Sequence, residues 1–286
     1  NRGGKASSME KIERVGIIGL GRMGRPMTRH LVKKGFAVTG FDVSDEAMAA
    51  AAALGAVKAA NPEEVARASD LVIVVVGFDT EAEEVVLGPD GLLAAAREGA
   101  VIAISSTVAP GTMKRLAVKG EGSGVAFLDA PLCRGERAAE EGKLLVMAGG
   151  DREVFEACRP AFAAFADAIF HLGDLGAGQV GKMVNNLILW ACISANYEGL
   201  KLGGELGVEE EPLRQALLQS SASNWALETW REERQMPWAE KDMTIVLREA
   251  DAARISLPLC GVVKEVIKGI KIERGHPMPG AVKPGP

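Results

Sequence analysis

The sequence predicts an α/β fold in which a doubly wound, mostly parallel sheet is followed by an all-α C-terminal domain, the two linked through a long helix. Short apolar runs alternate with alanine-rich helical stretches as far as about residue 172. After Gly178 the strand-like runs stop, and a helical pattern that is apolar almost all round covers 180–202. We therefore expect two domains, over residues 9–172 and 173–286.

The first domain is expected to hold six strands, because it contains six nearly continuous apolar runs. Such runs are typical of parallel strands that helices cover on both faces. The predicted strands are 15–18, 37–41, 71–76, 101–104, 125–128 and 144–147. Gly35 and Gly55 follow two helical stretches, where a left-handed residue commonly ends a helix. Asn61, Pro62 and Glu64 are typical of a cap, a first-turn proline and a capping-box acid.

The second domain is expected to be entirely helical. Three helices are predicted after the long one, at 211–219, 241–253 and 259–272, with an irregular tail at 277–286. The eight residues before Met9 are expected to be an expression remnant outside the fold. Because the long helix is apolar on nearly every side, we expect it to pack in a homodimer or homotetramer.

Composition and charge argue against several classes of protein. An apolar share of 48% and a charged share of 25% indicate a globular chain. The net charge of −5 offers no broad basic surface for nucleic acid. The apolar runs are far shorter than the roughly 20 residues that cross a bilayer, and no secretory signal is evident, so we expect no membrane partner and a cytoplasmic location.

The cysteines and histidines are too scattered to indicate a metal centre. Cys133, Cys158, Cys192 and Cys260 form no CxxC pair, which is typical of reduced thiols. The three histidines are equally far apart. We therefore expect neither a bound metal nor a catalytic histidine.

A glycine motif lies directly after the first predicted strand. Gly19, Gly21 and Gly24 have GxGxxG spacing, and Leu20 and Met23 lie within the same turn. At such a turn the first glycine permits a tight bend, the second lets a pyrophosphate approach, and the third lets helix pack on strand. The motif predicts a Rossmann dinucleotide-binding turn, with a structural turn as the alternative.

An acid closes the second predicted strand. Asp42 follows Gly19 by 23 residues, where a carboxylate can accept hydrogen bonds from both hydroxyls of the adenosine ribose. It would repel a 2′-phosphate, and no Arg or Lys follows within 43–48 to neutralise one. The sequence therefore favours NAD over NADP, unless Asp42 merely ends the strand.

A lysine occurs among apolar residues at the start of the long helix. Lys182 and Asn186 are four residues apart and so share a helix face, with Asn185 beside them. Most lysines are solvated surface groups, but the apolar neighbours of this one favour an acid or base.

Motifs along nearly the whole chain resemble those of the beta-hydroxyacid dehydrogenase family. The matching segments are GLGRMG at 19–24, SSTVAPGT at 105–112, DAPLCRG at 129–135, GAGQVGKMVNN at 176–186 and the KD pair at 241–242. The resemblance implies an NAD(P)-dependent oxidoreductase that interconverts a small beta-hydroxyacid and its semialdehyde or ketoacid by hydride transfer.

The resemblance also implies roles for individual residues. Lys182 would be the catalytic acid/base, and Asn186 would hydrogen-bond the substrate. Thr107 would lie near the nicotinamide ribose, and Lys241 would close over the nicotinamide unless it serves as a cap or ion-pair partner. Asn224 matches a stretch near the family's substrate mouth.

The chain departs from the family in its substrate loop. The usual loop reads close to DAPVSGG, whereas this chain has Cys133, Arg134 and Gly135. We expect Cys133 to replace a serine and Arg134 to clamp a second anionic group on a small anionic substrate. The alternative is that Arg134 points into solvent or pairs with Glu136 or Glu140.

Two other activities remain open. Imine reductases share the family architecture but generally lack a lysine at the position of Lys182. A non-catalytic NAD(H)-binding module is the alternative from another class of protein, and such relatives tend to lose the same lysine.

Overall fold

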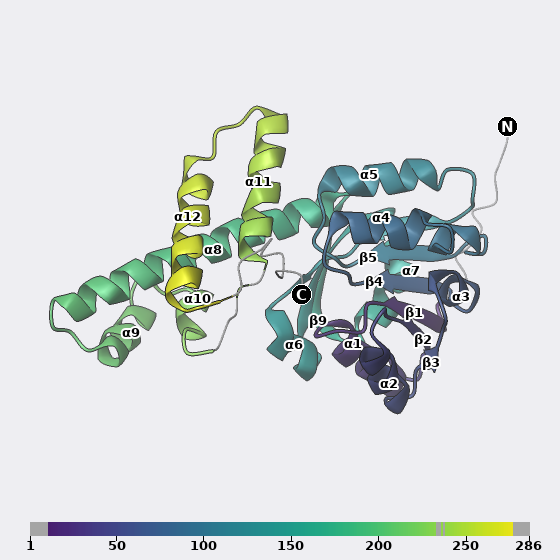
Figure 1. Ribbon diagram of the computed structural model, residues 1–286, viewed down its shortest axis with the longest axis horizontal. Helices are drawn as coiled ribbons and strands as arrows, with labels where there is room; N and C mark the ends of the chain where they lie inside the picture. Colours follow the sequence, from purple (N-terminus) through teal and green to yellow (C-terminus); the bar gives the residue numbers. More distant parts are fainter. Residues whose placement is uncertain (1–10, 233–235, 237, 277–286) are drawn as a thin grey trace, which may run out of the picture. The chain divides into compact units, whose positions relative to one another are not determined.

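The computed structural model describes residues 11–232, 236 and 238–276, and Figure 1 shows the order of their elements. The chain divides into two units between Lys182 and Met183. The first unit carries the sheet, and the described part of the second is helical. The predicted remnant before Met9 and the predicted tail at 277–286 lie outside the described residues.

In the described part of the chain, one sheet has the strand order β3-β2-β1-β4-β5-β6-β8-β7, with β9 beside β8. Its strands are β1 (Arg14–Ile18), β2 (Ala37–Phe41), β3 (Val57–Lys58), β4 (Leu71–Val74), β5 (Val101–Ile104), β6 (Ala126–Asp129), β7 (Leu132–Cys133), β8 (Leu144–Gly150) and β9 (Ala166–Gly173). The pairs from β3 to β6 are parallel. Because β1 pairs with both β2 and β4, the winding reverses at β1, which confirms the predicted doubly wound fold.

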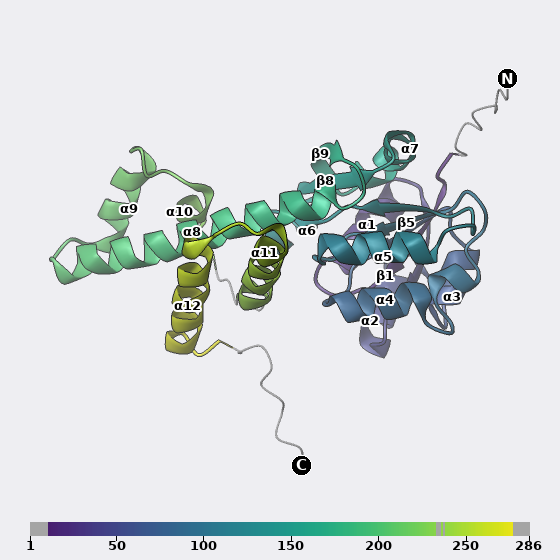
Figure 2. The ribbon, with the colours of Figure 1, turned by 90° about the horizontal axis from the view of Figure 1, so that it is seen from above.

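Helices cover both faces of this sheet, and alternate residues of each strand face opposite layers. In β5, Val101 and Ala103 belong to one core and Ile102 and Ile104 to the other. The first core includes α1 (Gly24–Lys33), α2 (Asp45–Ala53), α6 (Gly135–Glu141) and α7 (Arg152–Phe162). The second includes α3 (Pro62–Arg67), α4 (Asp79–Leu87), η1 (Leu92–Ala94) and α5 (Pro110–Lys119). Figures 1 and 2 both show α4 and α5 side by side on one face.

The local signals around the first helices behave as expected. Gly35 and Gly55 have φ of +90° and +99° at the ends of α1 and α2. The Asn61 side chain accepts the Glu64 amide at 2.9 Å. The Glu64 carboxylate accepts the amide of Ala60, one residue before the cap. The predicted helix ends are therefore confirmed, with the capping box shifted by one residue on its acidic side.

The sheet has an antiparallel end that the sequence pattern did not predict. β8 is antiparallel to β6 and β7 but parallel to β9. β3 and β7 are two residues long, which is too short for any periodicity. β9 is a longer strand whose residues are mostly not buried, so it lacks the continuous apolar run of the central strands.

The second unit packs four of its described helices around one core. α8 (Ala177–Glu205) begins in the first unit and continues into the second, followed by α9 (Glu210–Leu218), α10 (Trp225–Glu228), α11 (Ala239–Ala253) and α12 (Pro258–Glu273). Trp190, Met243 and Ile267 belong to its core. A buried ion pair joins α11 to α12, because Lys271 Nζ lies 2.7 Å from Glu240 Oε2. The four predicted helices are present, and the single turn α10 was not predicted. No helix in the described ranges is both long and apolar enough to cross a membrane.

Candidate active site

The turn between β1 and α1 needs glycine at two motif positions for reasons of space. Gly19 has φ of +90°, and a Cβ there would lie 2.2 Å from the carbonyl oxygen of Val75. A Cβ on Gly24 would lie 1.8 Å from the carbonyl oxygen of Gly19. At Gly21 no atom lies within 4 Å of the Cβ position. The backbone at Gly21 is therefore open, as the approach of a phosphate requires.

The first turn of α1 has no side chain that competes with an anion. Met23 stands at the N-cap without a side-chain hydrogen bond, and the turn carries no acidic residue. Helix N-terminal amides that no side chain caps attract anions, since the helix dipole is positive there. Leu20 is buried and Met23 half-buried, so both support the turn from the core. The residues present fit a dinucleotide pyrophosphate.

Asp42 is tied to the glycine turn by its own carboxylate. Its Oδ2 accepts the amide of Leu20 at 2.6 Å, and its Oδ1 accepts the amide of Ser44 at 2.8 Å. Carboxylate oxygens each accept more than one hydrogen bond, so ribose hydroxyls can still be bound. The next residue, Val43, is 94% exposed. The contact with Leu20 was not predicted, and it joins the end of β2 to the glycine turn.

The loop after β5 carries Thr107 and is held on two sides. The Ser106 hydroxyl accepts the amide of Val76 at 2.7 Å. The Gln179 side chain accepts the amide of Val108 at 3.1 Å and donates to the carbonyl of Ser106 at 2.8 Å. Thr107 itself is half-buried. Its backbone is thus fixed by bonds to the residues before and after it.

A carboxylate from the sheet caps the start of α8. Asp129, at the end of β6, is fully buried and accepts the amides of Gly176 and Gln179, both at 2.7 Å. Burial raises the pKa of Asp129, against the opposing effect of these amide bonds. An acceptor at a helix N-terminus satisfies amides that have no partner within the helix. The start of α8 is therefore anchored to the sheet.

Lys182 lies one turn further along α8 and points at the substrate loop. Its Nζ donates to the carbonyl of Leu132 at 2.7 Å and lies 3.9 Å from Cys133 Sγ. Burial raises the pKa of the Cys133 thiol, although Lys182 acts in the opposite direction. Cys133 is therefore a neutral thiol beside the lysine, as expected for a small replacement of serine rather than a nucleophile.

Arg134 and Gly135 form two successive left-handed residues, with φ of +82° and +76°. This conformation costs a residue with a Cβ about 1–2 kcal/mol. Arg134 Nη1 donates to the carbonyl of Lys143 at 2.9 Å and to the carboxylate of Asp167. The ion pair is partly exposed.

The two glutamates considered as alternative partners of Arg134 pair instead with arginines of the glycine turn and of α1. Glu136 pairs with Arg22, and Glu140 pairs with Arg29. The expected pairing of Arg134 with Glu136 or Glu140 is therefore wrong. Arg134 is exposed, and its ion pair is with Asp167 instead.

Asn186 lies in the second unit, where it is buried and its amide has defined partners. Its Nδ2 donates to Asp242 Oδ2 at 2.9 Å, and its Oδ1 accepts from Asn185 at 2.9 Å. Trp190 Nε1 lies 3.4 Å from the same Asp242 oxygen. The amide of Asn186 is therefore oriented, with its nitrogen toward α11.

Lys241 and Asn224 also lie in the second unit. Lys241 Nζ is 5.5 Å from the centroid of the Trp238 ring, within the range of a cation–π contact. Asn224 caps α10 by accepting the amide of Leu227 at 2.9 Å, and it exchanges hydrogen bonds with Asn196. A capping role accounts for Asn224 locally.

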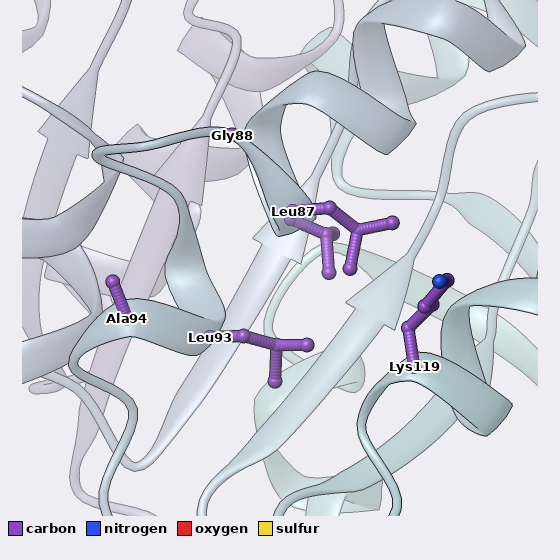
Figure 3. A pocket seen from close by; sticks show the side chains of 6 residues that line it. Leu87, Gly88, Leu93, Ala94 and Lys119 are labelled. Carbon is purple, nitrogen blue, oxygen red and sulfur yellow. The ribbon is translucent and has the colours of Figure 1, made fainter.

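A shallow hollow occurs elsewhere on the first unit. Leu87, Leu93 and Lys119 point into it from α4, η1 and α5 (Figure 3). α4 and α5 begin beyond the carboxyl ends of their strands and end near the amino edge, so the hollow lies away from the glycine turn. None of the candidate site residues lines it. Among the described residues, no cluster of three metal-ligating side chains occurs.

Asp129, Gln179 and Asp242 are candidate functional residues that the sequence analysis did not single out. Each is buried, and each hydrogen-bonds a residue or segment of the predicted site. The signal that could have found them is a polar residue within an apolar or glycine-rich motif. Asp129 and Gln179 lie inside quoted motifs, and Asp242 is half of the KD pair.

In the comparison with known proteins, two family models together match most of the chain. Residues 14–173 match the family described as the NAD binding domain of 6-phosphogluconate dehydrogenase. Residues 176–278 match the family described as NAD-binding of NADP-dependent 3-hydroxyisobutyrate dehydrogenase. The chain is 33% identical to 2-(hydroxymethyl)glutarate dehydrogenase of Eubacterium barkeri, covering 91% of this chain and 90% of that protein.

Two further relatives are also dehydrogenases. NAD-dependent L-serine dehydrogenase of Pseudomonas aeruginosa is 36% identical, covering 79% of this chain and 74% of that protein. The solved structure of Mycobacterium tuberculosis 3-hydroxyisobutyrate dehydrogenase with L-serine superposes with a TM-score of 0.82 at 25% identity, covering 92% of this chain and 94% of that one. The chain belongs to the beta-hydroxyacid dehydrogenase family of NAD(P)-dependent oxidoreductases.

Proposed function

We propose that this chain interconverts a small beta-hydroxyacid and its semialdehyde or ketoacid, with Lys182 as the general acid/base. The observation that carries this proposal is the placement of Lys182, half-buried at the start of α8 and bonded to the Leu132 carbonyl beside Cys133. A lysine held by a neutral carbonyl rather than by a carboxylate can give its proton to a substrate oxygen. The related hydroxyacid dehydrogenases support the reaction class.

The cofactor is proposed to bind along the carboxyl edge of the parallel strands. The residues proposed to hold it are Gly19, Leu20, Gly21, Met23, Gly24, Asp42, Thr107 and Lys241. When bound, the nicotinamide supplies or accepts the hydride. Asp42 would hold the adenosine ribose, and its negative charge next to an apolar, exposed Val43 favours NAD over NADP.

The substrate is proposed to be a small anion bound by Cys133, Arg134, Gly135, Asn186 and Asn224. Lys182 protonates the oxygen of the carbonyl substrate as hydride arrives, or removes the proton of the hydroxyl in reverse. Both hydrogen bonds described for Arg134 use Nη1. A guanidinium has five N–H donors, so the same side chain has further donors for a second anionic group of the substrate.

Each of the two domains is proposed to have its own function. The dinucleotide-binding domain would comprise residues 9–172, and residues 173–286 would serve the substrate and oligomerisation. Apolar residues on α8 remain exposed in the single chain: Val180 46%, Val184 52%, Ile188 59% and Leu202 60%. Such a stripe favours a homodimer or homotetramer through the helical domain.

We propose that the protein acts in the cytoplasm. Its four cysteines are free thiols in the structure, as a reducing compartment would keep them.

A panel assay tests the proposed function. Oxidation of NADH, and separately of NADPH, would be followed with glyoxylate and with tartronate, succinic, methylmalonate and sulfonated semialdehydes. Lys182→Ala should lower kcat by roughly 10²- to 10⁴-fold and leave NADH affinity nearly unchanged, whereas Lys58→Ala on β3 should keep full activity.

The outcomes of this assay separate the alternatives. Turnover that survives in Lys182→Ala would contradict the assigned role of the lysine. Tight NADH binding without turnover of any carbonyl substrate would favour an imine substrate or a non-catalytic NAD(H)-binding module.

A further inference from the structure

Gln179 bridges the start of α8 to the loop after β5. Its side chain is fully buried, accepts the amide of Val108 at 3.1 Å and donates to the carbonyl of Ser106 at 2.8 Å. These two bonds flank a single residue, Thr107. One amide side chain therefore sets the backbone on both sides of Thr107.

The backbone of Gln179 is fixed as well. Its own amide donates to Asp129 at 2.7 Å, and the amide of Gly176 donates to the other oxygen of the same carboxylate at 2.7 Å. Gln179 is therefore tied to β6 through its main chain and to the loop after β5 through its side chain. It has little freedom to move relative to either strand.

Lys182 is held by a hydrogen bond to one of the same segments, which together form a frame. It follows Gln179 by three residues, close to one helical turn. Its Nζ bonds to the carbonyl of Leu132, which follows Asp129 by three residues along the chain. Three segments, 106–108, 129–132 and 176–182, are thus joined by hydrogen bonds within the first unit.

We propose that Gln179 is a positioning residue, which sets the distance between Thr107 at the nicotinamide ribose and Lys182 at the reacting oxygen. This inference rests on the proposed function. Hydride transfer acts on the carbon of a carbonyl group and proton transfer on its oxygen. The nicotinamide and the lysine amine must therefore be held at a fixed distance from each other. A misplacement of about 1 Å can lower a rate roughly 100-fold.

Gln179→Leu removes both side-chain bonds at similar volume. We expect kcat to fall about 100-fold, with KM and NADH affinity changed less than threefold. The kinetic isotope effect with 4-deuterated NADH should rise, because hydride transfer becomes slower than the other steps. Ser194→Ala is the matched control, since it removes a buried side-chain bond to the Trp190 carbonyl in the same helix.

Gln179→Glu tests the hydrogen bonds themselves. A carboxylate can still accept the Val108 amide but repels the Ser106 carbonyl, whereas a protonated carboxyl can donate to that carbonyl. Relative to wild type at each pH, kcat of Gln179→Glu should therefore recover as the pH falls. A side chain that only fills the core would show no such recovery.

Amide hydrogen exchange provides a readout that does not depend on activity. In Gln179→Leu, exchange should rise at least tenfold in both 105–109 and 176–183, while Ser194→Ala leaves both segments protected. Unchanged exchange in 105–109 would overturn the inference. So would kcat that stays at the wild-type value while the melting temperature falls.

If wild type turns over no substrate of the panel, either the substrate lies outside the panel or the proposed function fails. The exchange data alone then decide whether Gln179 couples the two segments. Coupled exchange in an inactive protein would support the role of Gln179 in holding the two segments together. Uncoupled exchange would contradict it.

Discussion

The carboxylate of Asp42 accepts amides on both sides, from Leu20 in the glycine turn and from Ser44 at the start of α2. It therefore acts as a fixed negative charge at the end of β2. We propose that a fixed charge at this place favours a ribose hydroxyl over a ribose phosphate, because a phosphate would meet unshielded repulsion.

Asp42→Asn with Val43→Arg should shift cofactor preference toward NADPH. The exchange removes the repelling charge and adds a guanidinium at an exposed position, and a hydrogen bond to a charged group contributes about 1.5–3 kcal/mol. The ratio of kcat/KM for NADPH over NADH should rise at least tenfold in steady-state assays. Asp45→Asn, which changes the first residue of α2, should leave the ratio unchanged.

Arg134 combines a strained backbone with a partly exposed ion pair. Arg134→Gly and Arg134→Ala both lose the bond to Asp167, but only alanine keeps the left-handed penalty. The glycine variant should therefore be more stable than the alanine variant by about 1 kcal/mol, as measured by urea unfolding.

The same two variants test the anion clamp. Both should raise KM for the best dianionic substrate about tenfold and leave KM for a monoanionic one nearly unchanged. Equal KM values across wild type and both variants would contradict a role for Arg134 in binding substrate.

For single residues, the sequence predicts local backbone requirements better than contacts with distant residues. The spacing of Gly19, Gly21 and Gly24 fixes a turn with local geometry, which is why their different steric needs could be anticipated. Asp167 as the partner of Arg134 could not be, since a β9 residue 33 positions away meets the arginine only after the sheet has formed.

Among the elements, the start of α8 joins Lys182, the proposed acid/base, to the sheet. Gly178 is necessary there, because a Cβ would lie 2.4 Å from the Met147 carbonyl oxygen and 2.8 Å from Asp129 Oδ2. Asp129 can cap the helix only because this position has no side chain.

Gly178→Ala should therefore lower kcat at least tenfold by displacing the first turn of α8, together with a lower melting temperature. Gly204→Ala is the control in the same helix, since no atom lies within 4 Å of its Cβ position. It should keep full activity and gain up to about 1 kcal/mol of stability. Equal kcat in the two variants would show that the contact at Gly178 is unimportant.

The central strands and the long helices could be predicted because each carries its own periodic signal. Val101–Ile104 is buried at every position, and the predicted bounds match the observed strand. β7 has only two residues, and its pairing with β8 depends on where the chain returns after α6. Such an element is set by tertiary structure rather than by local pattern.

For the whole molecule, acid stability should depend on a carboxylate at the amino edge of the sheet. Burial acts to raise the pKa of Asp70, but hydrogen bonds from Arg14, from the amides of Glu13 and Arg14, and from Arg97 outweigh it and hold that pKa well below its usual range. A lowered folded-state pKa contributes stability above the unfolded value near pH 4, and that stability is lost as the pH falls through the folded-state value.

Asp70→Asn should lower the free energy of unfolding at pH 7 by roughly 1.5–3 kcal/mol, since it removes charge-assisted hydrogen bonds to two partly exposed arginines. Between pH 4 and pH 2 the variant should lose less stability than wild type. Urea unfolding at several pH values measures both effects, and parallel pH profiles for the two proteins would refute the assignment.

The most direct test of the central claim is the transfer of deuterium to the product from NADH that carries deuterium at both C4 positions. With a carbonyl substrate from the panel, mass spectrometry should find one deuterium on the carbon that bears the new hydroxyl, and the label should be nearly absent with Lys182→Ala at equal protein and time. A product formed without the label, or equal labelling by wild type and Lys182→Ala, would contradict hydride transfer assisted by this lysine.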